Sequence, residues 1–296
     1  MKIISLYSKI LTLCLFILIA FSPELTSQGT DSRRPGPASR ASKVSMTLWV
    51  NPLKTEVYSG EIKGVSGPVI ETGSTVNGAM NLDLFFSRAA GFTLGVGYNT
   101  FASQLSVASW SDDYSTKDSE TESYVLTIDG TSIIESLKIS FVHIPVGLTL
   151  RFPVEGKVGF SLNGGVGFNI PVVKSSEGSG RFSYSGYYSI YNVTLSNIPV
   201  YFPSNSTAST TGEIELKPMC LSLDASGSFF ISLGRKAQLL IGGYYTSSLA
   251  NILASEATSG YMISSKVNEM NSLLKGSSEA GFKAFGLKAG LRFTLK

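Results

Sequence analysis

Apolar and polar residues alternate along most of the chain from residue 43 onward. Residues 285–294, for example, carry Phe, Leu, Ala, Leu and Phe at the odd positions and Gly, Lys, Gly, Arg and Thr at the even positions. Because successive side chains of a β-strand point to opposite faces, this period of two predicts strands with one apolar and one polar face. The alternation recurs in eight segments, with a less clear phase in the seventh: 43–51, 77–88, 92–101, 142–152, 157–172, 221–231, 237–246 and 285–294.

The connections between these segments alternate between short and long. Tight turns are predicted at 89–91, 153–156 and 234–236. The other four connections span roughly 25 to 45 residues each, which is uncommon in compact soluble domains. An even number of strands, with short turns at one end and long loops at the other, is typical of outer-membrane barrels. We therefore predict an all-β fold, an eight-stranded antiparallel transmembrane β-barrel with short periplasmic turns and long extracellular loops.

Aromatic residues gather near both ends of the predicted strands. Those beside the short turns are Phe86, Phe92, Phe152, Phe160, Phe229 and Phe293, and those near the long loops are Tyr98, Phe101, Phe141, Phe168, Tyr245 and Phe285. From Phe285 to Phe293 a strand tilted by about 40° rises roughly 20 Å, close to the apolar band of such barrels. The two aromatic levels favour a membrane barrel over a secreted β-sandwich adhesin, which has no reason to place aromatics in this way.

The polar faces of the predicted strands are rich in Gly, Ser, Thr and Asn and carry a few charges. An eight-stranded barrel is only just wide enough for its own side chains, so these faces predict a filled interior and no pore. Buried charges need partners. We therefore expect Asp83 and Asp224 to form an ion-pair network with Arg151, Lys288 and Arg292 inside the barrel.

The N-terminal segment has the features of an export signal. Two lysines precede an apolar run at 10–21. About 12 apolar residues are too few to span a bilayer, which takes roughly 20, but they match the core of a signal peptide. Residues 29–42 are rich in Pro, Ser and Arg, which is typical of a flexible linker. The predicted organisation is therefore a signal peptide at 1–28, a periplasmic linker at 29–42 and an outer-membrane barrel domain at 43–296.

Composition excludes several other classes of protein. The chain has 296 residues, of which 15% are charged, against about 25% in ordinary soluble domains. Two cysteines and one histidine exclude a disulfide framework and a metal site built from Cys or several His. A dispersed net charge of +3 does not suggest a nucleic-acid-binding protein. The sequence therefore predicts no cofactor, no metal site and no nucleic-acid partner.

Three segments resemble strands of a known group of membrane proteins. They are 141–148 (FVHIPVGL), with an Ile-Pro step at the entry to the membrane, the glycine-rich 163–168 (NGGVGF) and the closing segment 285–293 (FGLKAGLRF). Together they are similar to the small eight-stranded outer-membrane barrels of the Bacteroidota type, including the PorT-like group. The resemblance covers residues 43–296. It implies an outer-membrane barrel and carries no catalytic residue.

His143 is the only histidine, so any histidine-dependent catalysis would have to use it. Some small outer-membrane barrels are lipid-modifying enzymes with a Ser–His pair on the outer wall. The alternation predicts that His143 points inward, and the residues two positions away on its face are Phe141 and Pro145. A serine on another strand, such as Ser161, remains an alternative, because a triad depends on geometry and not on sequence order. We predict no catalytic residue and a structural role for His143.

The long connection at 174–217 is rich in tyrosine among Ser, Gly and Asn, the composition of adaptable binding loops. Its candidate binding aromatics are Tyr184, Tyr187, Tyr188, Tyr191 and Tyr201. The alternative is that strands continue above the membrane and these rings pack between hairpins. In the preceding long connection, Asp129-Gly130 predicts a hairpin turn. Residues 261–274 predict a short amphipathic helix.

These observations predict a non-enzymatic outer-membrane barrel with a filled interior, which is either structural or binds through its extracellular loops. Its expected partners are the lipid of the outer membrane and an extracellular ligand or an envelope protein. One alternative, allowed by the PorT-like resemblance, is an accessory subunit of an envelope secretion or assembly machine. The other alternative is an outer-membrane lipid-modifying enzyme.

Overall fold

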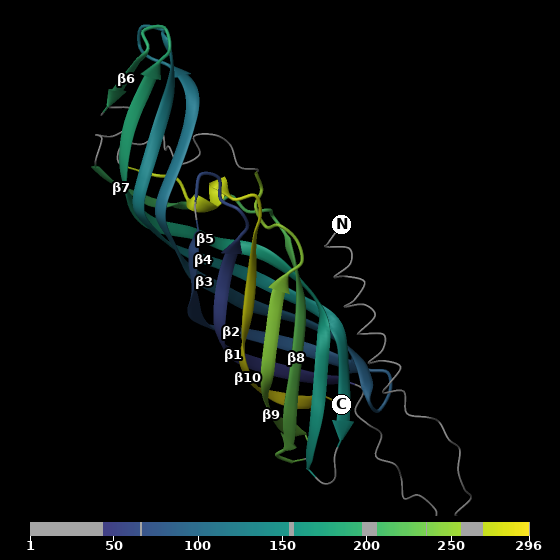
Figure 1. Cartoon of the computed structure of the whole chain (residues 1–296). Helices are drawn as coiled ribbons and strands as arrows, with labels where there is room; N and C mark the ends of the chain where they lie inside the picture. Colours follow the sequence, from purple (N-terminus) through teal and green to yellow (C-terminus); the bar gives the residue numbers. More distant parts are fainter. Residues whose placement is uncertain are drawn as a thin grey trace, which may run out of the picture. The chain divides into compact units, whose positions relative to one another are not determined.

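The computed structural model describes residues 44–65, 67–153, 157–196, 206–234, 236–255 and 269–295. The predicted signal peptide, the predicted linker and Tyr201 lie outside the described residues. The described part contains one 3-10 turn, η1 (Leu273–Gly276), and the strands shown in Figure 1: β1 (Val44–Ser59), β2 (Val69–Phe85), β3 (Ala90–Lys117), β4 (Ser123–Pro153), β5 (Val158–Tyr188), β6 (Val193–Ser196), β7 (Ser206–Glu213), β8 (Cys220–Ser232), β9 (Ala237–Ser248) and β10 (Ala280–Leu295).

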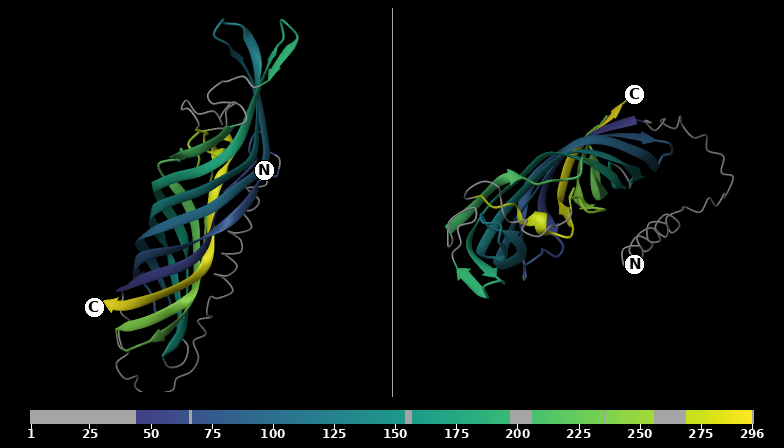
Figure 2. Two further views of the ribbon diagram at one scale, coloured as in Figure 1. Left: turned by 90° about the vertical axis from the view of Figure 1, so that its left-hand side faces the viewer. Right: turned by 90° about the horizontal axis from the view of Figure 1, so that it is seen from above.

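Eight of these strands close into a ring. The order around it is β1, β2, β3, β4, β5, β8, β9 and β10, and every neighbouring pair is antiparallel. The ring closes where β10 pairs with β1, from Val44 opposite Leu295 to Ser59 opposite Ala280. Figure 2 shows the resulting barrel from two further sides. The predicted eight-stranded antiparallel barrel is therefore confirmed, and each predicted segment lies within one strand of the ring or overlaps it closely.

The barrel carries its apolar side chains outside and its polar side chains inside. On β10, Phe285 and Leu287 are 57% and 65% exposed, whereas Lys288 and Arg292 are 5% and 1% exposed. On β9, where the sequence left the phase unclear, Leu240 is buried and Ile241 is exposed. An apolar exterior over a polar interior is the arrangement of a barrel surrounded by lipid. No helix in the described part of the chain is long and apolar enough to cross a bilayer.

The two ends of the barrel differ. At the short-turn end lie the two ends of the barrel chain and the brief connections β2–β3, β4–β5 and β8–β9. At the opposite, long-loop end, β3, β4 and β5 run on for many residues and have total lengths of 28, 31 and 31 residues. We call these extensions, together with β6 and β7, the projection. Residues 102–140 and 173–196 supply most of it (Figure 1).

Much of two predicted long loops is therefore strand. The reason is that apolar residues continue to alternate there and meet in a buried core, which the loops around Ile62 and Leu273 cover. The predicted turn at Asp129-Gly130 is wrong, because both residues are paired inside β4 with Ser183 and Phe182 of β5. The turn lies instead at 118–122, where the Asp118 carboxylate accepts hydrogen bonds from the backbone N–H groups of residues 120 and 122, as in an Asx turn.

A second apolar core fills the mouth of the barrel at the long-loop end. The rings of Phe101, Phe141 and Phe282 lie 4.3 to 5.8 Å apart in this mouth core. Leu274 of η1 packs onto it. In the described part of the segment predicted to be helical, the helical residues belong to the single turn η1, and residues 261–268 lie outside the description. The interior of the barrel is thus filled, but apolar at this end.

Candidate functional site

The first candidate site is the set of charged residues inside the barrel. Asp83 on β2 and Arg292 on β10 point inward from strands on either side of β1, and their Oδ2 and Nη2 atoms lie 3.4 Å apart. Both side chains are almost fully buried. Hydroxyl groups complete the pair, because Thr47 donates to Asp83 at 3.3 Å and Thr93 donates to its other oxygen. The ion pair and the hydroxyl groups thus take the place of water around two buried charges.

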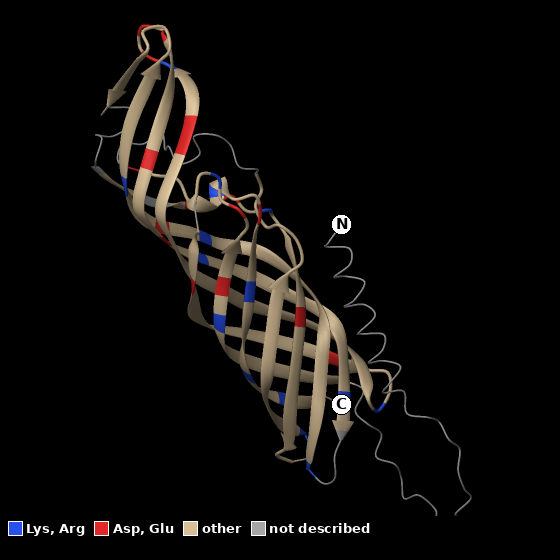
Figure 3. Cartoon of the chain, viewed as in Figure 1, with Lys and Arg blue, Asp and Glu red and all other residues tan. Residues whose placement is uncertain are grey.

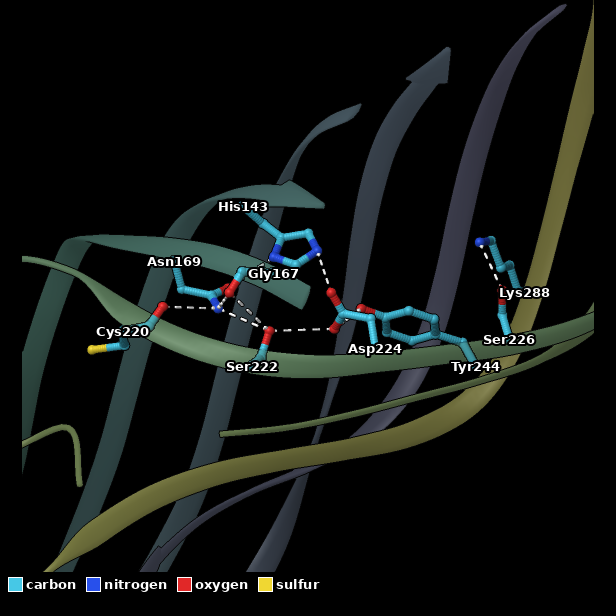
Figure 4. A network of polar contacts seen from close by, with 9 residues as sticks. All are labelled: His143, Gly167, Asn169, Cys220, Ser222, Asp224, Ser226, Tyr244 and Lys288. Atoms are coloured by element: carbon cyan, nitrogen blue, oxygen red, sulfur yellow. Dashed lines mark hydrogen bonds and ion pairs between the residues drawn. The ribbon is translucent and has the colours of Figure 1, made fainter. Parts of the chain in front are cut away.

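Asp224 on β8 belongs to a separate cluster (Figure 4). Its Oδ2 atom lies 3.2 Å from Nε2 of His143 on β4. Its Oδ1 atom accepts hydrogen bonds from Tyr244 at 3.1 Å and from Ser222 at 3.3 Å. On the other side of the imidazole, Nδ1 of His143 lies 2.8 Å from Oδ1 of Asn169. Four strands therefore meet around one histidine.

Lys288 and Arg151 occupy aromatic surroundings. The Lys288 ammonium lies 3.7 Å from the centre of the Trp49 ring and donates to Ser226 at 3.3 Å. The Arg151 guanidinium lies 4.8 Å from the centre of the Phe230 ring. Cation–π contacts of this kind stabilise a partly desolvated cation. The five charges that the sequence grouped in one network are thus distributed over an ion pair, a His–Asp cluster and two cation–π contacts.

The partners of Asp224 were not predicted from the sequence. His143, Asn169 and Ser222 lie on predicted polar faces, so the alternation indicated that they point inward, whereas Tyr244 lies in the segment whose phase was unclear. Contact between His143 and Asp224 depends on the register of β4, β5 and β8. That register is set by pairings between segments as much as 81 residues apart, for which the period of two gives no information.

A small cavity of about 50 Å³ lies beside these residues and is lined by Asn81, Asn99, His143, Asp224, Tyr244 and Lys288 among others. A cavity of this size holds a few water molecules and no larger ligand. No group of three or more His, Cys, Asp or Glu residues with metal-site geometry occurs in the described ranges. The polar groups that line this cavity thus serve to hold the charged side chains of the barrel itself in place.

The geometry around His143 does not match a nucleophile–base pair. Both ring nitrogens face oxygen acceptors, on Asn169 and Asp224, so neither is available to take a proton from a serine hydroxyl. The nearby Ser222 hydroxyl donates to Asp224. Ser161 pairs in register with Arg151, whereas His143 pairs with Asn169, eight positions further along the strand. The serine that the sequence analysis named therefore lies roughly 26 Å from the histidine.

The second candidate site is the tip of the projection, where the hairpin β3–β4 meets the hairpin β5–β6. The Tyr188 ring stacks on Tyr124 with centroids 4.9 Å apart and an interplanar angle of 12°. Its hydroxyl donates to Asp118 at 3.2 Å, and the Tyr191 hydroxyl donates to Glu122 at 2.6 Å. These contacts cross from one hairpin to the other. The tip is therefore one surface and not two independent loops.

The surroundings of the Tyr188 and Tyr191 hydroxyl groups also raise the pKa values of these groups. Partial burial and Asp118 raise the pKa of Tyr188. The hydrogen bond to Glu122 raises the pKa of Tyr191. Both hydroxyl groups thus stay protonated and continue to donate as the solution becomes mildly alkaline.

The predicted binding aromatics divide into buried and exposed groups. Tyr184 is buried in the core of the projection, and Tyr188 is half-buried in its stack. Tyr187, whose hydroxyl donates to Asn192, is exposed, and so is Tyr191. Both readings of the tyrosine-rich segment therefore describe part of it, since some rings pack between hairpins and others face solvent.

Large apolar side chains are exposed at the same tip. Ile190 is 72% exposed and Tyr191 58%, and Val193 and Leu195 on β6 are 44% and 48% exposed. These aliphatic residues lie within the tyrosine-rich stretch, but no pattern in the sequence distinguished them from the residues around them.

The tip is also acidic. The segment 111–129 contains six acidic residues and one lysine, whereas the described segment 182–196 carries no charge. Figure 3 shows acidic positions along the projection and at its end. On a chain with a formal net charge of +3, the projection is a negative pole. It combines carboxylates, phenols and aliphatic side chains on one surface.

Comparison with solved structures finds outer-membrane proteins. The attachment invasion locus protein Ail of Yersinia pestis, crystallised with a heparin analogue, is 12% identical, with 85% of this chain and 99% of that chain covered and a TM-score of 0.32. OprG of Pseudomonas aeruginosa is 11% identical, with 85% and 96% covered and a TM-score of 0.37. The protease OmpT of Escherichia coli is 8% identical, with 86% and 98% covered and a TM-score of 0.33. Likeness at this level identifies neither a ligand nor an activity for this chain. No protein-family model and no curated protein matches the sequence.

Proposed function

We propose that the chain is a non-enzymatic barrel of the outer membrane that binds a partner outside the cell through the tip of its projection. In this orientation the short-turn end faces the periplasm and the projection extends away from the cell. The predicted signal peptide supports export, and the long strands support a binding role, because they carry the tip well beyond the apolar belt. The filled interior and the engaged histidine supply no route or chemistry for a substrate.

The observation that carries the proposal is an exposed apolar surface on a tip whose two hairpins are joined by hydrogen bonds. The surface consists of Ile190, Tyr191, Val193 and Leu195. Burying such side chains gains about 25 cal/mol per Å² of apolar surface. Flexible loops lose part of this gain when they become ordered on binding. Here hydrogen bonds from Tyr188 and Tyr191 hold the two hairpins together before any partner arrives. Most of the gain therefore remains available for affinity.

The charge of the tip defines the chemistry of the partner. Asp118 and Glu122 accept hydrogen bonds from Tyr188 and Tyr191 beside the apolar side chains, and Glu120 lies in the same turn, so an anionic partner would be repelled. A protein segment that carries both basic and apolar side chains satisfies both features of the surface. We therefore propose a basic protein surface as the partner of the tip.

The test is selection of displayed peptides against the purified barrel in lipid nanodiscs. We expect enrichment of basic peptides with apolar residues, and at least a tenfold loss of their binding when Ile190→Ser and Tyr191→Ser are combined. The matched control is Ile134→Ser, which removes an exposed aliphatic side chain from β4 away from the tip. Selected peptides that bind the tip variant as well as the unaltered barrel would refute the proposal. Retention of a heat-dependent gel shift shows that each variant still folds.

The resemblance to the PorT-like group supports a different role, as an accessory subunit of an envelope machine. That role predicts that other envelope proteins remain with the barrel during mild purification. It also predicts that tip substitutions leave this association unchanged, so the two proposals are separable in one preparation.

A further inference from the structure

A polar hollow lies on the outer face of the sheet, beside the start of β2 and where β3, β4 and β5 pass from the barrel into the projection. Its volume is about 430 Å³, within the range of about 300 to 1,000 Å³ that is typical of small-molecule sites. Small residues form its floor: Gly73, Ala102, Ser136 and Ser175. A Cβ atom on Gly73 would lie 2.6 Å from the carbonyl oxygen of Ala102, so this position requires glycine.

The polar side chains of the hollow form a row across the four strands. Glu71 pairs in register with Gln104, Gln104 with Ser136, and Ser136 with Glu177. Lys138 stands two residues along β4 and shares the outer face of the sheet. The side chains of Glu71, Gln104, Lys138 and Glu177 make no hydrogen bond or ion pair with the part of the chain that the structure describes. Their donors and acceptors are therefore open to a ligand.

The hollow borders the lipid-facing surface. On β2 the exposed Val76 follows Gly73 by three residues, and on β5 the exposed Val172 and Val173 precede Ser175 by two or three. Two or three residues of strand correspond to roughly 7 to 10 Å. The hollow thus opens sideways from the barrel wall, just above its apolar belt at the long-loop end. This is the level at which lipid headgroups surround a membrane barrel.

The chemistry of the hollow fits a hydroxyl-rich ligand. It offers two carboxylates and the hydroxyl oxygens of Ser136 and Ser175 as acceptors, and an ammonium, an amide and the Ser136 hydroxyl as donors, because the Ser175 hydroxyl already donates to the carbonyl oxygen of Lys138. No aromatic or exposed aliphatic side chain lines it, so it does not suit an acyl chain. Two carboxylates against one ammonium make it unfavourable for a phosphate group. A neutral sugar ring, which presents donors and acceptors on every side, remains.

We propose that this hollow binds the headgroup sugars of glycolipids in the surrounding membrane leaflet. The glycolipid then has its acyl chains against the apolar belt and its first sugars between Glu71 and Glu177. The site lies on the outer wall and is separate from the tip, so the inference does not depend on the partner proposed for the projection.

The experiment measures retention of defined glycolipids by delipidated barrel with native mass spectrometry. The probes are a diacylglycerol that carries a neutral disaccharide headgroup, the same diacylglycerol without sugar, and the free disaccharide. The variant that fills the hollow is Ser136→Trp. The matched control is Thr127→Trp, on the same outer face of β4 but higher on the projection. A gentler second variant combines Gln104→Ala with Glu177→Ala, which removes hydrogen-bonding groups without adding bulk.

We expect unaltered barrel and Thr127→Trp to retain the sugar-bearing glycolipid at least tenfold better than the sugar-free diacylglycerol. Ser136→Trp and the double alanine variant are expected to reduce retention to the level of the sugar-free diacylglycerol. Equal retention of both lipids by the unaltered barrel would overturn the proposal, because acyl contacts alone would then explain binding. Undiminished retention by the folded double variant would also overturn it. Binding of the free disaccharide as tight as that of the glycolipid would refute the membrane as its source.

Discussion

The buried ion pair of Asp83 and Arg292 determines whether the charges inside the barrel stabilise or destabilise the fold. Asp83 and Arg292 are both almost fully buried, and removing two such charges from water costs several kcal/mol per ion. The ion pair, together with the hydroxyls of Thr47 and Thr93, compensates that cost. The balance therefore depends on both partners being present. Removal of one leaves a buried charge with too few partners.

We predict that Asp83→Ala destabilises the folded barrel by about 3–5 kcal/mol, the usual cost of breaking a buried pair by deleting one partner. Combining Asp83→Ala with Arg292→Met is expected to recover much of that loss, because no unpaired charge then remains. Urea unfolding of the barrel in lipid vesicles, followed by tryptophan fluorescence, measures both values. A double variant that is no more stable than Asp83→Ala would contradict this account.

At the scale of elements, one carboxyl group connects the projection to the loop that covers it. Glu135 of β4 is fully buried, and its Oε2 atom accepts a hydrogen bond from the backbone N–H of Leu273 in η1 at 2.8 Å. Burial raises the pKa of Glu135 to about 7, although hydrogen bonds from Ser272, Leu273 and Ser176 lower it in part. Because the residue lies in the projection, outside the predicted membrane-spanning segments, we expect water to reach it if η1 opens.

We predict that opening of η1 becomes easier as the pH rises from about 5 to 8. Between the ordinary pKa of 4.5 and the folded value of about 7, the closed state holds a proton that the open state releases. Closure therefore loses stability with rising pH, by up to roughly 3 kcal/mol. Amide hydrogen exchange of residues 273–276, corrected for intrinsic rates, measures it. Glu135→Gln is expected to remove this pH dependence, and an unchanged slope in that variant would contradict the prediction.

The elements also show which features the sequence could reveal. The period of two identified all eight barrel strands, because lipid outside and a narrow polar interior impose opposite requirements on neighbouring residues. It did not distinguish a strand that ends at the membrane surface from one that continues. Continuation above the membrane was therefore one of two alternatives for residues 174–217, and the lengths of β3, β4 and β5 were not predicted. Asp129-Gly130 predicted a turn, but pairing on both sides overrides that local preference. Contacts between distant strands, such as His143 with Asp224, required the register.

For the whole molecule, three interior layers close the barrel from one end to the other. The mouth core of Phe101, Phe141 and Phe282 fills the long-loop end. The His143 cluster occupies the middle, and the Asp83–Arg292 pair lies near the short-turn end, within three residues of the ends of β2 and β10. A smaller apolar cluster of Trp49, Phe230 and Leu240 lies toward the short-turn end. The cavity of about 50 Å³ among them is too small to form a path.

These layers predict that the barrel conducts no ions. Reconstituted in a planar bilayer, it is expected to give no steady current steps at neutral pH. The variant Phe101→Ala opens space in the mouth core and is expected to destabilise the barrel by about 3–5 kcal/mol. It is still expected to give no current, because the polar middle and the Trp49 cluster remain in place. Steady conductance of the unaltered barrel would show that the interior is open. Conductance of Phe101→Ala alone would show that the mouth core is the only seal.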